Sequence, residues 1–309
     1  MAKMQQHNIM LEAGTNEYEI LVFRLGDRRC GVNVAKVREV IEFQPLTRLP
    51  ETHHAVLGVF QLRDQVLPLI DLGICLGQNQ GSGSASGQII VMEYNETRVA
   101  FRVDAVEYIH RIKASEVEPM PDVHGLQHSP VTFVARISGD LVLMIDFEKL
   151  VFDIAGIDPF AVGLGEIEAC SIRGARRLLL AEDSVMIRTM IHNNLVKAGY
   201  KQVTTCADGQ AAWDALLAGL VDGQGPSFDL MVTDIEMPRM DGLHLTKRIK
   251  EHPQLNHLPV VVFSSLISAD NAKKCESVGA DAQITKPELG KLVSVVDGLL
   301  EHLEVPAAV

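Results

Sequence analysis

The sequence has few cysteines and no long apolar run, and each shortage excludes a class of protein. Its five cysteines are scattered and odd in number, with no Cys-x-x-Cys pair, which argues against a disulfide framework or a cysteine metal site. No apolar stretch reaches the ~18 to 20 residues that span a bilayer, and the N-terminus has no apolar run of signal-peptide length. We therefore expect a protein of the reducing cytoplasm, with buried free thiols at Cys30, Cys75, Cys170, Cys206 and Cys275.

Basic residues are also scarce. The chain has 28 Lys and Arg against 40 Asp and Glu, a formal net charge of -12, which repels phosphate backbones unless a local basic patch overrides it. Binding to nucleic acid or direct insertion into a membrane is therefore not expected. With 47% hydrophobic and 22% charged residues the composition is that of a globular protein, and at roughly 150 residues per domain the length predicts about two domains.

The sequence pattern of the N-terminal half is typical of a β domain. Short β-type runs are separated by turn signals such as Ser138-Gly139-Asp140, and one helix is predicted near residues 34–41. A Gly/Ser-rich tract at 78–87 is expected to be a loop within this domain. Many short strands at this spacing predict barrels or a sandwich. The strongest strand predictions cover residues 19–25, 89–92, 98–103, 131–135 and 141–145.

The C-terminal half alternates strand-like and helical runs. The aperiodic, glycine-containing stretch before it marks a junction. Five strand-helix units follow, which predict an α/β doubly wound parallel sheet with its ligand site at the carboxyl ends of the strands. The predicted organisation is a tail at 1–17, a first domain at 18–158, a linker at 159–175, a second domain at 176–304 and a tail at 305–309.

Polar residues follow four of the five predicted strands of the second domain. Glu182-Asp183 follow the first, Asp234 the third, Ser264 the fourth and Lys286 the fifth. A single carboxylate after a strand is commonly a helix N-cap. Because the carboxyl ends of parallel strands meet at one edge, however, all these groups are expected to converge there.

Converging carboxylates repel one another and raise their own pKa values unless a cation lies between them. Mg²⁺ suits such a site, since it takes oxygen ligands and is commonly held by one or two carboxylates together with phosphate oxygens. Asp234 can then act as a nucleophile that accepts a phosphoryl group. Lys286 and Ser264 can neutralise and hydrogen-bond the phosphoryl oxygens.

The second domain resembles the receiver domain of two-component response regulators. The resemblance rests on Glu182-Asp183, Asp234-Ile235-Glu236-Met237-Pro238, Asp241-Gly242, Ser264 and Lys286-Pro287. It implies a flavodoxin-like five-stranded sheet, Asp234 as phosphoacceptor, and Mg²⁺ held by Glu182, Asp183 and Asp234. It also implies Ser264 as the switch hydroxyl and Lys286 as the phosphoryl-binding lysine. Many receivers have an aromatic residue three positions before this lysine, and here that position is Gln283.

The first domain resembles the CheW family of chemotaxis coupling proteins over residues 18–33, 37–41 and 56–72. This resemblance implies paired small β-barrels that join chemoreceptors, the methyl-accepting chemotaxis proteins, to the histidine kinase CheA. It places a coupling interface at Val37, Glu39 and Arg63. The alternative for Arg63 is a structural ion pair, with Asp71 as a candidate partner. Asp64 stands where the family usually has glycine.

Together the two halves resemble the arrangement of CheV. That implies an adaptor at chemoreceptor arrays, regulated by phosphorylation of Asp234, whose receiver catalyses only its own phosphorylation and dephosphorylation. The runner-up is a phosphate sink that drains the kinase without altering coupling. A haloacid-dehalogenase-type phosphatase would need Asp-x-Asp, and the chain has Asp234-Ile235-Glu236. A DNA-binding regulator would need a basic helix-turn-helix module after the receiver, where about five residues are expected beyond the last helix.

Overall fold

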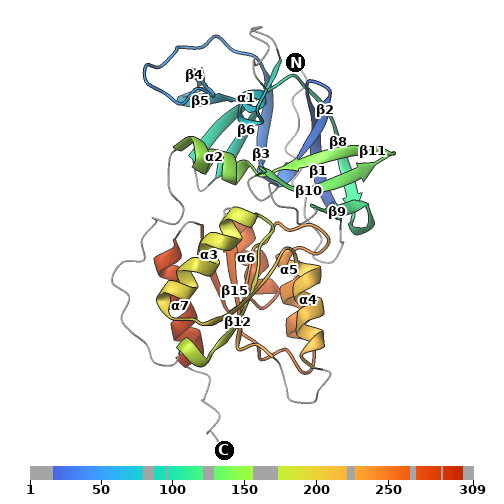
Figure 1. Cartoon of the computed structure of the whole chain (residues 1–309), viewed down its shortest axis with the longest axis vertical. Coiled ribbons are helices and arrows are strands. Elements are labelled where there is room, and N and C mark those ends of the chain that lie inside the picture. Colours follow the sequence, from blue (N-terminus) through green and yellow to red (C-terminus); the bar gives the residue numbers. More distant parts are fainter. Residues whose placement is uncertain are drawn as a thin grey trace, which may run out of the picture.

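The computed structural model describes residues 17–78, 87–94, 97–120, 129–155, 173–220, 227–264, 269–286 and 288–301. The predicted tails, most of the Gly/Ser-rich tract, Cys170 and most of the predicted linker lie outside these residues. Two domains stack along the long axis, the β-rich N-terminal domain above the α/β C-terminal domain (Figure 1). None of the helices in the described part of the chain is long and apolar enough to cross a membrane.

The first sheet of the N-terminal domain has six strands in the order β8-β1-β2-β11-β10-β9. Successive residues of β1 point to opposite faces: Ile20 and Val22 pack in one apolar cluster, Leu21 and Phe23 in another. Both faces are therefore buried. The strands are β1 (Glu17–Leu25), β2 (Arg28–Asn33), β8 (Ala105–Lys113), β9 (Val117–Pro119), β10 (Val131–Ile137) and β11 (Asp140–Ile145).

The second sheet has five strands in the order β3-β6-β7-β5-β4. Along β6, Ile90 and Met92 face the cluster that the first sheet shares, whereas Ile89 and Val91 face a separate cluster. The expected β domain is confirmed as two sheets around a common core. The strands are β3 (Val37–Glu42), β4 (Val56–Leu62), β5 (Gln65–Asp71), β6 (Gln88–Tyr94) and β7 (Thr97–Val103).

The helix predicted near residues 34–41 is wrong. Asn33 caps only a single 3-10 turn, η1 (Val34–Lys36), and the chain then enters β3. The β-branched residues Val37, Val40 and Ile41 pair along β6 instead of continuing a helix, in keeping with their preference for strands. The other helical elements of this domain are α1 (Leu72–Cys75), η2 (Ala114–Glu116) and α2 (Phe147–Ala155).

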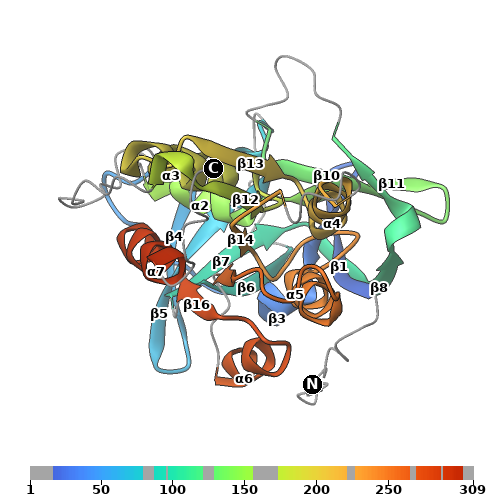
Figure 2. The same ribbon diagram turned by 90° about the horizontal axis from the view of Figure 1, so that it is seen from below.

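The C-terminal domain has the predicted doubly wound parallel sheet, with strand order β13-β12-β14-β15-β16. Helices α3 and α7 cover one face and α4 and α5 the other (Figure 2). The strands are β12 (Arg177–Ala181), β13 (Gln202–Cys206), β14 (Leu230–Thr233), β15 (Val260–Ser264) and β16 (Ala282–Thr285). The helices are η3 (Arg173–Ala175), α3 (Val185–Ala198), α4 (Gly209–Ala218), α5 (Gly242–Glu251), α6 (Ala269–Ser277) and α7 (Leu289–Glu301).

Candidate functional site

Three carboxylates meet at the carboxyl edge of the parallel sheet. Glu182 and Asp183 follow the last residue of β12, and Asp234 follows the last residue of β14. One oxygen from each carboxylate lies within 4.8 Å of the other two. Adjacent parallel strands thus bring together residues about fifty positions apart, as the sequence predicts.

Lys286 joins this group from the end of β16. Its Nζ lies 2.7 Å from Oε2 of Glu182 and 3.2 Å from Oδ2 of Asp234. The backbone N–H of Lys286 donates to the carbonyl of Ser264 at 3.1 Å, so β15 and β16 deliver both residues to the same edge. The side chains are almost fully buried, with exposed fractions of 3% for Asp234, 1% for Ser264 and 3% for Lys286.

The loop after Asp234 is built around close backbone packing. The Asp241 carboxylate accepts from the His244 N–H at 2.7 Å and so caps α5. A Cβ at Gly242 would lie 1.8 Å from the Asp234 carbonyl oxygen. Only glycine fits there, which gives a physical reason for the Asp241-Gly242 pair in the motif.

Burial and mutual repulsion set the protonation of the cluster. Burial, partly offset by Lys286, raises the pKa of Glu182 well above its ordinary value. Burial also raises the pKa of Asp183 to about 7 and that of Glu236 to about 8, and the nearby Asp234 adds to both shifts. Burial alone would lower the pKa of Lys286, but Asp234, Glu148 and Glu182 raise it well above its usual range.

This donor set fits a hard divalent cation. Glu182, Asp183 and Asp234 offer oxygen ligands within one small volume, which is the chemistry that Mg²⁺ prefers. Oε2 of Glu182 lies 2.7 Å from Lys286 Nζ, but neither of these buried atoms has a hydrogen bond of good geometry. A cation among the three carboxylates would offset their mutual repulsion, which adds to the effect of burial on the raised pKa values of Glu182 and Asp183.

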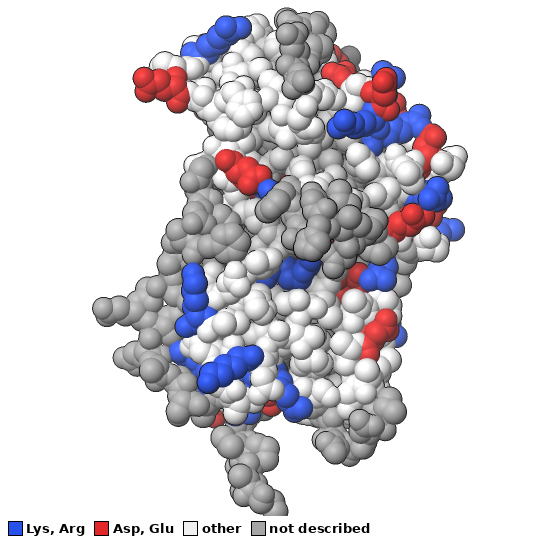
Figure 3. Space-filling view, viewed as in Figure 1, with Lys and Arg blue, Asp and Glu red and all other residues white. Residues whose placement is uncertain are grey.

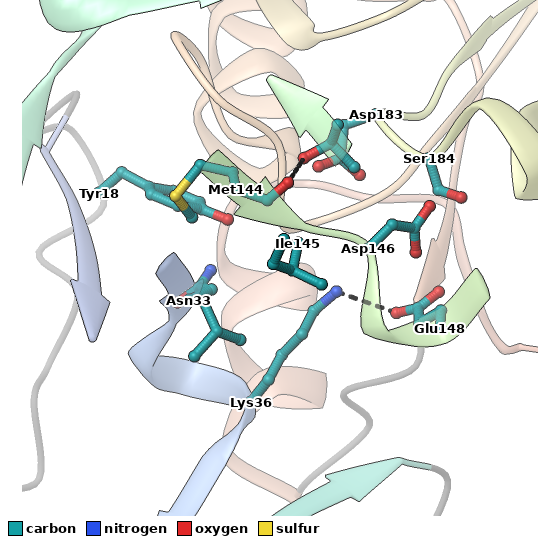
Figure 4. Close-up of a pocket in the computed structure, with 11 residues that line it drawn as sticks. Tyr18, Asn33, Lys36, Met144, Ile145, Asp146, Glu148, Asp183 and Ser184 are labelled. Atoms are coloured by element: carbon teal, nitrogen blue, oxygen red, sulfur yellow. Dashed lines mark hydrogen bonds and ion pairs between the residues drawn. The ribbon is translucent and has the colours of Figure 1, made fainter. Parts of the chain in front are cut away.

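The N-terminal domain supplies further charged groups to the same site. Glu148, in the first turn of α2, lies 3.7 Å from Lys286 Nζ through Oε2 and 3.0 Å from Lys36 Nζ through Oε1. Lys36 Nζ in turn lies 3.5 Å from Oε2 of Glu236. Figure 4 shows Lys36 and Glu148 pointing toward each other, with Asp183 and Ser184 of the C-terminal domain nearby.

A small cavity separates the two domains at this point. Residues of both domains line it, including Tyr18, Asp146 and Asp183, and its volume open to the centre of a water molecule is about 20 Å³. Burial, followed by the charges of Asp183 and Glu236, raises the pKa of Tyr18 well above its ordinary value. Sequence reasoning missed these N-terminal residues, because an acid at the start of a helix and a lone lysine carry no signal of a distant partner.

The predicted coupling residues lie elsewhere on the N-terminal domain. Arg63 Nη2 is 3.0 Å from Oε2 of Glu39, and the two side chains are 73% and 28% exposed. The suggested pairing of Arg63 with Asp71 is wrong, because Asp71 is bound to the buried Arg102. Val37 packs half-buried against the core. Acidic and basic side chains are interspersed over this domain on the face seen in Figure 3.

Arg63 begins a two-residue turn between β4 and β5 and has a φ of +55°. A non-glycine residue in this region is strained. Leu62, Arg63, Asp64, Gln65 and Arg98 line an open hollow with Glu39. The turn therefore presents the Arg63 side chain to solvent at a cost in backbone energy.

Comparison with known proteins agrees with both halves of this description. Residues 19–155 match the CheW-like domain family, and residues 178–297 match the response regulator receiver domain family. The chain has the CheV-type organisation. A CheW-like domain is followed by a receiver domain, as the sequence predicts.

Relatives of the same organisation cover nearly the whole chain. Chemotaxis protein CheV3 of Helicobacter pylori is 27% identical over 278 residues, 88% of this chain and 88% of the relative. Chemotaxis protein CheV1 of the same species is 27% identical over 308 residues, 93% of this chain and 94% of the relative. Chemotaxis protein CheW of Rhizobium meliloti is 31% identical over 133 residues, 43% of this chain and 86% of that protein.

Proposed function

We propose that this protein couples chemoreceptors to the histidine kinase CheA, and that phosphorylation of Asp234 regulates the coupling. The observation that carries the proposal is the convergence of Glu182, Asp183, Asp234 and Lys286 at one sheet edge in contact with the CheW-like domain. The relatives named CheV and CheW support the chemotaxis role. The protein acts as an adaptor, working at receptor arrays on the cytoplasmic side of the membrane.

Asp234 is the proposed phosphoacceptor. One of its carboxylate oxygens attacks the phosphorus of the kinase phosphohistidine, so that a P–O bond forms and the P–N bond breaks. The electron pair of that bond stays on the imidazole nitrogen, which takes a proton from solvent. Lys286, 3.2 Å from Asp234, neutralises phosphoryl charge, and Ser264 donates its hydroxyl to a phosphoryl oxygen. Hydrolysis of the acyl phosphate by water later returns the carboxylate and releases inorganic phosphate.

Glu182, Asp183 and Asp234 are the proposed ligands of Mg²⁺. When bound, the ion offsets charge on the phosphoryl oxygens. The side chains contribute a preset arrangement, since Ser184 caps α3 through the Ile187 N–H at 3.2 Å and fixes the loop that carries Glu182 and Asp183. Phosphoryl uptake therefore depends on both the ion and the carboxylates.

Arg63, Glu39 and Val37 are the proposed contact to the array, and Val37 lies two residues before Glu39 on β3. Arg63 is exposed and presents a guanidinium, which is favoured at interface hot spots. Its backbone strain supports a functional role, because a strained turn persists where the side chain is needed.

A phosphate sink is the competing function. Direct contact between the receiver's Lys286 and Glu148 of the CheW-like domain favours regulated coupling, because a change at Asp234 is felt by the other domain. A pure sink has no need of such a contact.

The first test of the proposal is phosphoryl uptake from a labelled kinase by the wild type and by Asp234→Asn. The amide keeps the shape of the side chain but removes the nucleophilic oxygen, so the variant is expected to take no label. Chelation of Mg²⁺ is expected to abolish uptake by the wild type and re-addition to restore it. Normal label on Asp234→Asn would contradict the assignment of the phosphoacceptor.

A further inference from the structure

Helix α2 has one face for each domain. Phe147 and Leu150 belong to the core of the CheW-like domain, whereas Phe152 packs against the main apolar cluster of the receiver. Glu148 lies one turn before Phe152, and residues four apart share a face of a helix. The same face of α2 therefore makes the Phe152 contact and the Glu148 contacts with the receiver.

Glu148 interacts with Lys286, which is the lysine that a phosphoryl group on Asp234 would bind. The ammonium group of Lys286 already lies near Glu182 and Asp234, and Glu148 is its third carboxylate neighbour at 3.7 Å. Lys36 fixes the other oxygen of Glu148 at 3.0 Å. These carboxylates compensate the charge of Lys286, although its Nζ has no hydrogen bond of good geometry to any of them. A phosphoryl group that arrives at Asp234 would therefore compete with Glu148 for this ammonium.

Access to Asp234 is closed in this arrangement. The phosphoacceptor is 3% exposed, and the interdomain cavity that Asp183 and Glu148 line has about 20 Å³ of open volume, which is room for about one water molecule. A phosphohistidine of another protein has to bring its phosphorus against an oxygen of Asp234. That approach requires α2 to move away first.

We propose that α2 is a latch over the phosphorylation site, in which Glu148 and the phosphoryl group compete for Lys286. The proposal rests on the function assigned to Asp234 above and adds the contact that transmits its state. Detachment of α2 admits the donor, and the phosphoryl group on Asp234 then holds Lys286. Because Glu148 would also face the added negative charge, the phosphorylated site disfavours reclosure.

The latch couples the two domains because the phosphoryl group and the closed position of α2 exclude each other. Whatever the phosphoryl group gains by binding Lys286, the closed arrangement loses, as linkage requires. Lys36 extends the competition, since it contacts Glu148 of its own domain and Glu236 of the receiver. The surface affected is thus the carboxyl edge of the sheet.

The test uses the full-length protein and four variants with acetyl phosphate, a small acyl phosphate, as donor. Glu148→Gln keeps the size of the side chain and removes its charge, and Phe152→Ala removes an apolar contact that involves no charged group of the site. Asp153→Asn is the matched control, because this carboxylate lies on the same helix, is 53% exposed and pairs with Lys149 of its own domain. Asp234→Asn defines the background.

The latch predicts faster initial phosphorylation in both Glu148→Gln and Phe152→Ala. The gain is expected within the usual range for coupled sites, about 5- to 150-fold, with Asp153→Asn at the wild-type rate. Small-angle X-ray scattering of the unphosphorylated proteins is expected to give a larger radius of gyration for the two latch variants than for the control. Phosphorylation of the wild type is expected to produce the same increase.

Other outcomes overturn the latch in distinguishable ways. Wild-type rates in both latch variants, with Asp234→Asn unlabelled, would refute the latch and leave the proposed function standing. A gain in Glu148→Gln alone, with unchanged scattering, would mean that Glu148 acts only through its charge. No label on any protein, from acetyl phosphate or from the kinase, would defeat the proposed function and the competition for Lys286 with it.

Discussion

Each domain contains a buried ionic group, and the two groups differ in charge balance. In the CheW-like domain Asp71 faces Arg102 at 2.5 Å, with both side chains about fully buried, and the second oxygen of Asp71 caps α1 through the Ile74 N–H at 3.1 Å. Asp71 therefore has a base at close range and a helix to cap, while Arg102 also lies 3.7 Å from the partly exposed Asp104. The Asp71 carboxylate thus has a structural role, since both of its oxygens already have partners.

At the receiver edge the acids outnumber the bases. Among the described residues, five carboxylates lie around two lysines, and a sixth, Asp146, lines the adjoining cavity. Burial raises the pKa values of three of the five. Burying unbalanced charge is costly, so such a group persists where a cation or a reaction uses it. The balanced pair of the CheW-like domain thus has a structural role, whereas the charge excess at the receiver edge is typical of a site that binds a cation or carries out a reaction. The five carboxylates are Glu148, Glu182, Asp183, Asp234 and Glu236, and the two lysines are Lys36 and Lys286.

Breaking the balanced pair tests this distinction with the largest expected effect. Arg102→Met removes the base and leaves Asp71 buried and uncompensated, which typically costs about 3 to 5 kcal/mol. We expect a loss of this size in the free energy of unfolding of the CheW-like domain, measured by urea denaturation. Phosphoryl uptake by Asp234, assayed below the unfolding transition, is expected to stay at the wild-type level. A loss of uptake without unfolding would show that the pair is not merely structural.

Removing an acid from the unbalanced group is expected to act on ion binding. Asp183→Asn should weaken Mg²⁺ at least about tenfold, because ligand-shell changes commonly cost 10- to 100-fold in affinity. Isothermal titration calorimetry of the full chain measures this directly. Asp214→Asn on α4, an exposed acid paired with Gln210, is the control and should bind Mg²⁺ as the wild type does. Equal affinity of the two variants would remove Asp183 from the proposed site.

The exposed ion pair of the CheW-like domain should matter for binding and not for folding. Arg63→Glu is expected to weaken association with receptor-kinase arrays about tenfold, the range of a moderate hot spot. The free energy of unfolding should change by less than about 1 kcal/mol, because exposed pairs contribute little. Co-sedimentation with arrays and phosphotransfer to Asp234 are measured side by side. An equal loss in both assays would assign Arg63 a structural role.

The smallest effect is expected from relieving strain at the same turn. Arg63→Gly removes the side chain from a residue with a φ of +55°, and the left-handed region costs a non-glycine residue roughly 1 to 2 kcal/mol. Glycine also loses more entropy on folding, so a net gain of about 0.5 to 1 kcal/mol in stability is expected from thermal unfolding. Array association should fall as in Arg63→Glu. Reduced stability would mean that the turn is not strained.

The receiver and its site are largely predictable from the sequence because topology fixes where strand ends meet. Once residues 176–304 are interpreted as alternating strands and helices, Asp183, Asp234 and Lys286 must reach the same edge. The covering of both faces follows from the same pattern, whereas the flavodoxin-like sheet was implied by the resemblance to receiver domains. A residue's position at the end of a strand is enough to place it at this edge, whatever contacts its side chain makes.

The contacts between domains are not predictable in this way. The partners of Glu148 lie at positions 36 and 286, and no periodicity links a helix start in one domain to a strand end in the other. The helix predicted near residues 34–41 was wrong for a related reason, since pairing of β3 with β6 overrode a helix-like local pattern. Arg63 likewise pairs with Glu39 of β3 and not with Asp71, although β3 and the β4–β5 turn lie at opposite ends of the strand order.

The measurement that tests the account most directly is array affinity with and without phosphorylation. Binding of the full chain to receptor-kinase arrays is measured by co-sedimentation before and after saturating phosphoryl donor, with Asp234→Asn in parallel. Regulated coupling predicts that phosphorylation changes the affinity of the wild type by about 5- to 150-fold and leaves Asp234→Asn unchanged. Identical affinity in both states, with Asp234 demonstrably phosphorylated, would contradict regulated coupling and leave the phosphate sink in its place.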